Sequence, residues 1–471
     1  MEIRYPEYYK QFRCLAGECP DTCCVAWEIR VDRETAGLYK ELSKERNRLG
    51  RKLKARIRRG KIVPEGEFCP FLGVDHLCDI QRTHGEKALC RACRQYPRHM
   101  EDYGALQEML LLMSCPEAAR LILTGGEGFC LRKRPESKES AEKQAEGIDR
   151  ELLRALLTVR ERLFQILSDR RESLDFRMMA VLKICYEMQK QIEVGEKKQI
   201  EADLDAVLKV ADPKSSWRSS WEKKEALLEA KRFSFMADRM AEIASFDRIS
   251  RKWPAMLEQC RSILYHSEGS RERYAKDRER FLEEWPEAEL QWERICRYFL
   301  YSFFLTALYD GKVFAKAKMA VFCTFMIEDL YLASWRKDER REIWNREESQ
   351  KRLAEQVKIC QTAARQIENS AENRDRLERL LDPSSVKTDD LSRKIGGRFQ
   401  QLRISWAASS GVPMRPMGIS SSKACRSSGA RNRFISVSMA PQAMALTWIL
   451  EGASSFARAI VRALTPPLEA E

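Results

Sequence analysis

The stretch ICRYFLYSFFLTALY at residues 295–309 decides the fold class, because it is the most apolar candidate segment of the chain. Arg297 interrupts it, and it is shorter than the roughly 20 apolar residues that a membrane-spanning helix requires. A helix buried in a protein core satisfies both observations. We therefore expect a protein with no membrane-spanning segment, built around this helix.

Apolar residues recur at helical spacing on both sides of this stretch. Leu152, Leu156 and Val159 begin one such apolar face, and Ser173 is placed to cap the helix that follows. Further helices are expected at residues 224–246, 285–309, 315–335, 340–368 and 371–381. The pattern predicts a multi-helix domain over residues 148–385.

Composition agrees with a mainly α fold. The 471 residues include 33% charged residues and only 21 glycines, and the length favours two or three domains. The net charge of +13 is a weak signal. The basic run at 46–61 reads best as an amphipathic helix with a solvated face, and docking of an acidic protein surface is the alternative. No aromatic platform accompanies this run, which disfavours nucleic acid.

The amino-terminal part of the chain is rich in cysteine. Of the 16 cysteines, the first 115 residues contain nine: Cys14, Cys19, Cys23, Cys24, Cys69, Cys78, Cys90, Cys93 and Cys115. The first residues show no basic region followed by an apolar stretch, so no secretory signal is expected and the predicted location is cytoplasmic. Thiols stay reduced there, which favours metal binding by all nine over disulfides.

The spacing of these cysteines favours an iron–sulfur cluster over zinc. Zinc sites usually use two pairs of closely spaced ligands, whereas only Cys90-x2-Cys93 has that spacing here. Iron–sulfur clusters accept more varied spacings. The C-x3-C-x2-C signature of radical enzymes is not met, because Ala26 stands where its third cysteine belongs. Zinc remains the alternative, with His76, His84 or His99 as a further ligand or as ordinary polar residues.

Two boundaries frame the helical domain. Residues 1–130 are expected to form a small cysteine-rich α+β metal-binding unit, with a buried strand at 109–113 and a helix from Pro116 to Leu123 that stops at Gly125. Residues 131–147 form a charged linker. Residues 386–471 are expected to be an irregular, disordered tail or the result of a reading-frame change, because 396–471 carry nine Lys or Arg against three Glu and no Asp.

Four segments of the cysteine-rich unit resemble the flagellin lysine-N-methylases, a family that shares its start with proteins thought to chelate zinc or iron. The segments are RYPEYYKQFRCLAGECPDTCCVAWEI at 4–29, FCPFLGVDHLCDI at 68–80, ALCRACRQYPR at 88–98 and SCPEAARLIL at 114–123. A looser similarity continues to residue 381, through CRYFLYSFFLTALYDG at 296–311 and QIENSAENRDRLERLL at 366–381.

The resemblance implies methyl transfer from S-adenosylmethionine to flagellin lysines, in a protein that holds a [4Fe-4S] cluster. The residues themselves assign no catalytic group and no cofactor pocket, because the Gly-rich strand–turn–helix of many methyltransferases is missing. They also leave a different class open, namely a non-enzymatic metal-binding or redox module with a helical interaction domain. Oligomeric state is not predicted.

Overall fold

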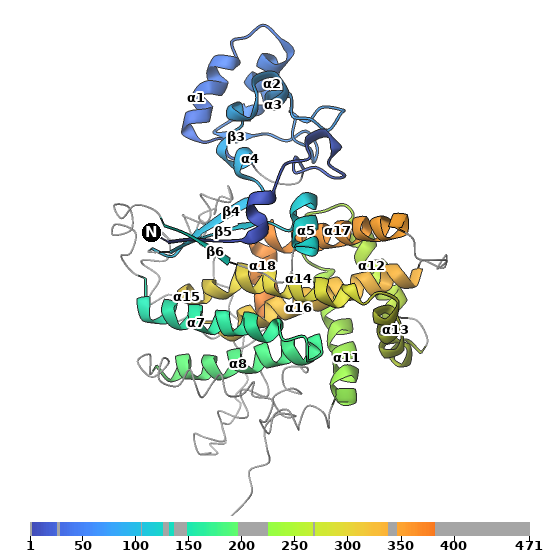
Figure 1. Ribbon diagram of the computed structural model, residues 1–471. Coiled ribbons are helices and arrows are strands. Elements are labelled where there is room, and N and C mark those ends of the chain that lie inside the picture. The colour runs from blue at the N-terminus through green and yellow to red at the C-terminus, as the bar shows by residue number, and fades with distance from the viewer. Residues whose placement is uncertain are drawn as a thin grey trace, which may run out of the picture.

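The computed structural model describes residues 2–25, 29–104, 106–125, 131–135, 148–195, 225–266, 269–337 and 346–381 (Figure 1). These residues are mainly helical, which confirms the predicted fold class. The predicted tail at 386–471 and most of the predicted linker, residues 136–147, lie outside the described residues. Within the described ranges, no helix is both long and apolar enough to cross a membrane.

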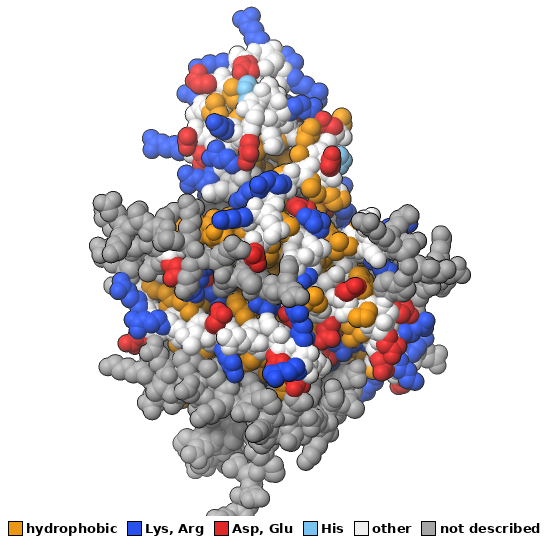
Figure 2. All heavy atoms as spheres, in the orientation of Figure 1, with side chains coloured by type: hydrophobic (Ala, Val, Ile, Leu, Met, Phe, Trp, Pro, Cys, Tyr) orange, Lys and Arg blue, Asp and Glu red, His pale blue; other side chains and the backbone are white. Residues whose placement is uncertain are grey.

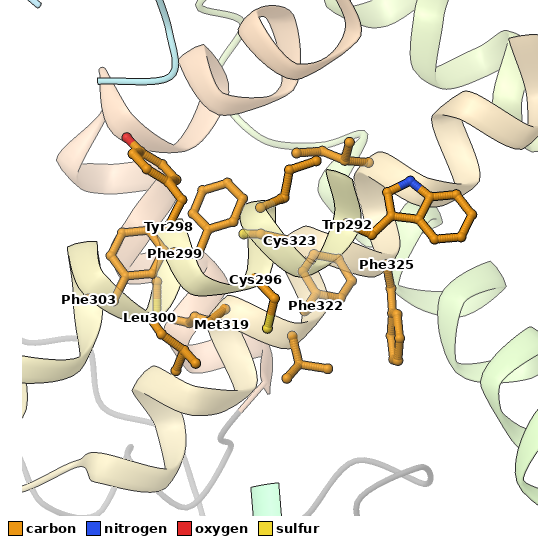
Figure 3. Packing of buried hydrophobic residues seen from close by; sticks show 14 of the residues in the cluster. Trp292, Cys296, Tyr298, Phe299, Leu300, Phe303, Met319, Phe322, Cys323 and Phe325 are labelled. Atoms are coloured by element: carbon orange, nitrogen blue, oxygen red, sulfur yellow. The ribbon is translucent and has the colours of Figure 1, made fainter. Parts of the chain in front are cut away.

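The core is built on two adjacent helices, α14 (Glu287–Phe303) and α16 (Val313–Lys337). Nearly every side chain of α16 is buried, as expected for a helix enclosed on all sides. Figure 3 shows Cys296 and Phe299 of α14 among Met319, Phe322 and Cys323 of α16. The predicted buried helix is confirmed as α14, and η6 (Phe304–Thr306) and α15 (Ala307–Asp310) continue the stretch.

Other helices surround this pair. The helices α7 (Arg150–Leu167) and α8 (Leu174–Val194) lie where periodicity predicted them, and Ser173 accepts a hydrogen bond from the backbone of Phe176 as a cap. The helices α11 (Glu225–Ile243), α17 (Arg346–Glu368) and α18 (Ala371–Leu381) also match predicted ranges.

Two of the described helices in the helical body were not predicted. They are α12 (Trp253–Leu264) and α13 (Ser270–Glu284). Only Ser270, Tyr274 and Phe281 of α13 are buried, so its charged sequence shows little apolar periodicity. Tertiary packing of these few side chains is therefore the main support for α13.

A four-stranded sheet covers one side of the helical body (Figure 1). Its order is β4 (Arg98–Asp102), β5 (Leu106–Leu111), β1 (Glu2–Pro6) and β6 (Leu131–Pro135), with β1 parallel to β5 and the other pairs antiparallel. The strand predicted at 109–113 overlaps β5, which begins three residues earlier and ends at Leu111. The first five residues of the predicted linker form β6, so pairing with β1 extends past residue 130.

The cysteine-rich residues divide between two packing units. The sheet and α5 (Pro116–Thr124) belong to the main core, through side chains such as Phe12, Leu110 and Ile122. Residues 29–95, which lie between β1 and β4 in the sequence, form a lobe with a separate small core. Its elements are α1 (Arg33–Leu42), α2 (Arg48–Arg56), β2 (Ile57–Arg58), β3 (Lys61–Ile62), α3 (Asp79–His84), η3 (Glu86–Ala88) and α4 (Arg91–Gln95).

The basic run at 46–61 lies in this lobe. Leu49 and Leu53 of α2 are buried, as the helical stripe predicted, but the helix ends at Arg56 because Ile57 enters the short hairpin of β2 and β3. Figure 2 shows Lys and Arg side chains spread over the exposed surface of the lobe. This distribution is typical of a solvated face.

A buried ion pair joins the sheet to α7. Arg160 and Glu108 are each 2% exposed, and Arg160 Nη1 donates to Glu108 Oε2 at 2.7 Å. Removing one member of such a pair leaves the other charge buried alone, which costs about 3–5 kcal/mol. We expect Glu108→Gln to lower the free energy of unfolding by this amount in urea denaturation.

The matched control is Glu41→Gln, which removes one partner of the exposed pair between Glu41 and Lys44. Exposed pairs contribute little, so the control should unfold like the parent. Equal urea midpoints for both variants would contradict the assigned importance of the buried pair.

Candidate metal centre

The nine predicted cysteine ligands lie where the lobe joins the helical body. Cys14, Cys19, Cys23 and Cys24 follow η1 (Glu7–Gln11) on the way into the lobe, around η2 (Ala16–Glu18). Cys69 and Cys78 flank a knuckle closed by the bridge between Leu72 and Cys78. Cys90 and Cys93 lie at α4, and Cys115 directly precedes α5. The cysteines among the described residues are all free thiols.

Cys90 and Cys93 form the best-defined thiol pair. Their sulfur atoms are 3.5 Å apart, and the backbone N–H of Cys90 donates to the Tyr39 hydroxyl at 3.1 Å. Two metal–sulfur bonds of about 2.3 Å at a tetrahedral angle place their sulfurs about 3.8 Å apart. The hydrogen bond between the thiols lowers the pKa of Cys90 and raises that of Cys93. Cys90 is therefore the first of the two to ionise.

A second set of thiol contacts involves the consecutive residues Cys23 and Cys24. The Cys23 and Cys24 thiols are hydrogen-bonded to each other, and this bond raises the pKa of Cys23. It acts in the opposite direction on Cys24, but hydrogen bonding to Cys69, burial and the neighbouring thiols raise the pKa of Cys24 to about 12. Backbone pairing supports this contact, because Cys69 N–H donates to the Cys24 carbonyl at 2.9 Å.

Backbone N–H groups point to several of the sulfur atoms. Burial raises the pKa of Cys78, and hydrogen bonds from Ile80 and Gln81 oppose that rise. Burial likewise raises the pKa of Cys115 to about 12, against hydrogen bonds from Glu117 and Ala118. Hydrogen bonds of this kind stabilise thiolates and tune metal–sulfur centres.

The donor chemistry fits zinc or an iron–sulfur cluster, since thiolates are soft ligands. Over the residues that the structure describes, however, no three Cys, His, Asp or Glu side chains are arranged around one point closely enough to hold an ion. The predicted fourth ligands are placed differently: His99 pairs with Glu101 at 2.7 Å, and His84 lies 3.9 Å from Glu45. The structure thus brings several thiols near one another, but among the described residues it does not arrange three of them around a single metal position.

In the helical body, Arg365 of α17 binds two cysteine-bearing segments of the chain, one at Thr22 and one at Ser114. Its guanidinium donates to the carbonyls of Thr22 and Ser114, each at 3.3 Å, and these residues directly precede Cys23 and Cys115. The same group lies 3.6 Å from Asp21. Burial raises the pKa of Asp21, but Arg365 and other hydrogen-bonding partners lower it on balance. We call this junction of α17 with the two segments the seam.

Glu368 lies one helical turn further along α17 in the seam. Its Oε1 accepts a hydrogen bond from the Tyr298 hydroxyl at 2.5 Å, and its Oε2 accepts one from the Ser114 backbone at 2.9 Å. Tyr298 in turn accepts a bond from the Met113 backbone at 2.9 Å. Burial of the carboxylate raises the pKa of Glu368. A carboxylate with a raised pKa beside a tyrosine is suited to proton transfer.

Sequence reasoning did not single out these seam residues. Tyr298 and Glu368 both lie inside segments quoted for the resemblance, but nothing in their spacing links α14 to α17. Arg365 sits on a helix whose charged residues resemble an ordinary solvated face. Only the folded chain brings them next to Cys115.

A deeper polar cluster lies within the helical body. Asp329 of α16 accepts hydrogen bonds from Tyr265 and from Tyr274, the latter at 2.5 Å, and Arg232 lies 3.7 Å away. Burial raises the pKa of Asp329 to about 6, against the lowering effect of Arg232 and the tyrosines. Arg232 also pairs with Glu328 at 2.7 Å, but its Nε has no hydrogen-bond partner among the described residues, so the cluster is buried without being fully satisfied.

A shallow hollow of about 270 Å³ lies between α5, α14 and α17. Its wall includes Leu123, Trp285, Leu290, Arg294 and Leu353. It adjoins the C-terminal end of α5, whereas Cys115 precedes the other end. The hollow and the seam therefore lie at different places along the same helices, α14 and α17.

Comparison with known proteins identifies the carboxy-terminal part of the chain. Residues 160–391 match the family model of the FliB lysine N-methylase C-terminal domain. This range contains both α14 and the α17 residues of the seam.

Individual relatives agree with this match. The lysine-N-methylase of Salmonella typhimurium is 28% identical over 140 residues, which is 28% of this chain and 35% of the relative. The flagellar biosynthetic protein FliU of Salmonella muenchen is 28% identical over 137 residues, 27% of this chain and 81% of that protein. The match therefore spans about a third of the Salmonella typhimurium methylase.

No solved structure matches this chain. The cysteine-rich resemblance of residues 4–123, the domain model over residues 160–391 and the named relatives point the same way. The chain is thus similar to the flagellin lysine N-methylases, and the model of that family's C-terminal domain covers residues 160–391.

Proposed function

We propose that this protein is a cytoplasmic lysine N-methyltransferase that transfers methyl groups from S-adenosylmethionine to lysine side chains of flagellin. The observation that carries the proposal is the match of residues 160–391 to the lysine N-methylase domain. The seam adds chemical support, because it combines a thiol cluster with a carboxylate whose pKa is raised.

The reaction requires a neutral lysine nitrogen. Its lone pair attacks the methyl carbon of the sulfonium, the carbon–sulfur bond breaks, and S-adenosylhomocysteine leaves. A lysine in water is an ammonium, so one proton must pass to a base before or during transfer. In the proposal Glu368 accepts this proton, and its hydrogen bond from Tyr298 orients the carboxylate.

The surroundings of Glu368 suit this role. Glu368 is of intermediate burial as a residue, but its carboxylate is buried and accepts hydrogen bonds from Tyr298 and Ser114. The ionisable groups that face it are Tyr8, Tyr298, Cys323 and Arg374. A [4Fe-4S] cluster, with zinc as the alternative, would be held by thiols of the seam; it would supply an iron-based centre that ties the lobe to the body.

The direct test of function uses protein purified without oxygen and with its metal retained. It is incubated with S-adenosylmethionine and flagellin, and flagellin is then weighed by mass spectrometry. We expect a mass increase of one methylene for each methyl group transferred, located on lysine by peptide mapping. Unchanged flagellin from a metal-loaded preparation would refute the proposal.

A non-enzymatic metal-binding module is the second candidate, and the thiol gathering supports it without requiring a methyl donor. Calorimetric titration with S-adenosylmethionine separates the two candidates. A simple metal carrier should release no heat of binding, whereas the methyltransferase should bind the donor in a saturable way.

The role of Glu368 can be tested by Glu368→Gln. Loss of a positioned base typically lowers the rate 10²–10⁴-fold, and we expect kcat to fall within that range. In the parent, the rate should rise with pH through the raised pKa of Glu368, because only the ionised carboxylate accepts a proton. The variant should lose this limb of the pH profile.

Glu355→Gln is the matched control, since Glu355 lies on the same helix in an exposed pair with Lys358. It should leave kcat and the pH profile unchanged. Thermal unfolding checks integrity: the amide of the variant can replace only one of the two acceptor oxygens, so the fall in the midpoint should correspond to no more than the loss of one buried hydrogen bond, about 1–3 kcal/mol. A stable Glu368→Gln variant with the parental pH profile would exclude Glu368 as the base.

A further inference from the structure

The hollow between α5, α14 and α17 contains a buried amide that makes no hydrogen bond. Gln356 lines this hollow and is only 2% exposed. Neither its Nε2 nor its Oε1 has a hydrogen-bond partner within the described part of the chain. Buried amides are nearly always hydrogen-bonded, because an unmade bond in the interior is costly. The Gln356 side chain is therefore available to a group that offers one acceptor and one donor.

A second glutamine adds an unpaired atom to the same hollow. Gln291 of α14 lines it, and its buried Oε1 also lacks a hydrogen-bond partner among the residues that the structure describes. The hollow thus presents unpaired amide atoms from two helices. Because both atoms of the Gln356 amide are unpaired, the argument is the same for either orientation of that amide.

The remaining walls suit a flat apolar group. Leu123, Leu290 and Leu353 supply aliphatic surface, and Trp285 supplies an aromatic ring. The Arg352 guanidinium lies 5.8 Å from the centre of the Trp285 ring. Aromatic rings and guanidinium planes of this kind stack on nucleobases. At about 270 Å³, the hollow is slightly smaller than the roughly 300–1,000 Å³ of pockets that enclose drug-sized molecules, so it fits one end of a larger ligand.

We infer that this hollow binds an adenine base, with the Gln356 amide on its hydrogen-bonding edge and the Trp285 ring against its face. Adenine carries an exocyclic N–H donor next to a ring-nitrogen acceptor, and one glutamine amide pairs with both at once. Adenine can reach the hollow from two sources, namely the methyl donor or a free adenine nucleotide. Only the first source rests on the proposed function.

Two arginines at the hollow suit the rest of such a ligand. Arg294 and Arg352 both line it, and Arg294 is positioned by donating to the Leu123 carbonyl at 2.5 Å. Guanidinium groups bind carboxylates and phosphates through charge-assisted hydrogen bonds. The methyl donor carries a carboxylate and a nucleotide carries phosphate, so these charges favour both sources.

The position of the hollow sets its role. Gln356 precedes Glu368 by about three helical turns, roughly 18 Å along α17. A base in the hollow therefore does not touch the seam, and any reacting group of the ligand extends beyond the hollow. Gln356 and Trp285 recognise the ligand and take no part in proton transfer.

Calorimetric titration of full-length, anaerobically purified protein with adenosine tests the inference. We expect saturable binding, and binding at least about fivefold weaker for purine riboside, which lacks the exocyclic amine. Gln356→Leu should weaken adenosine binding about 5- to 150-fold, the usual contribution of a bidentate amide–adenine pair. It should still fold, because an apolar side chain replaces an unpaired amide. Gln350→Leu, at an exposed glutamine of the same helix, is the matched control and should bind like the parent.

Competition separates the two sources of adenine. Stronger displacement of adenosine by S-adenosylhomocysteine than by adenosine monophosphate would assign the hollow to the methyl donor, and the reverse would assign it to a free nucleotide. Both results support an adenine site. Photolabelling with 2-azidoadenosine covers the case in which a variant fails to fold. The label is expected on the peptides that contain Trp285 or Gln356.

Four results would overturn the inference: no saturable binding of adenosine, equal binding of purine riboside, label confined to other peptides, or a folded Gln356→Leu variant with parental affinity. None of these readouts uses flagellin. Adenosine binding by a protein that leaves flagellin unmethylated would refute the proposed function alone. Methylation of flagellin without adenosine binding at the hollow would refute this inference alone.

Discussion

The hydrogen bonds of Arg365 connect the parts of this molecule that matter most for its chemistry. One buried guanidinium binds the carbonyls of Thr22 and Ser114, which lie far apart in the chain. Each carbonyl fixes the position of the cysteine that follows it. Because Arg365 is anchored on α17, the orientation of that helix also sets the positions of Cys23 and Cys115.

The same constraint places acid–base groups beside the thiols. Glu368 follows Arg365 by three residues, so both project from one face of α17. Ser114 is bound by both side chains, through its carbonyl by Arg365 and through its N–H by Glu368. The seam is therefore one hydrogen-bonded unit that joins a thiol cluster to a carboxylate and to Tyr298. Side contacts such as that of Lys252 with Asp21, at 3.3 Å, strengthen the attachment of the amino-terminal segment.

Much of the helical body could be predicted, because burial imposes a period on the sequence. The apolar positions of α7 and the apolar stretch of α14 around Arg297 show this directly. The period fails where few side chains are buried, as in α13, and where pairing depends on distant segments. Nothing local in residues 131–135 shows that they pair with β1. The nine cysteines were identified as candidate ligands from residue type alone, but which of them lie next to one another depends on tertiary packing. Arg365 and Glu368 were missed because the local sequence of a helix does not show whether a charged side chain points into the protein or to solvent.

The parallel pairing of β1 with β5 has a consequence for synthesis of the chain. In the sequence the lobe and β4 lie between these two strands, although the two strands are neighbours in the sheet. As the chain leaves the ribosome, β1 stays without its β5 neighbour until the whole lobe has emerged. The thiols of the lobe are therefore available before Cys115 and long before α17. Synthesis therefore presents the lobe first, and the Arg365 and Glu368 side chains that complete the seam only when α17 has emerged.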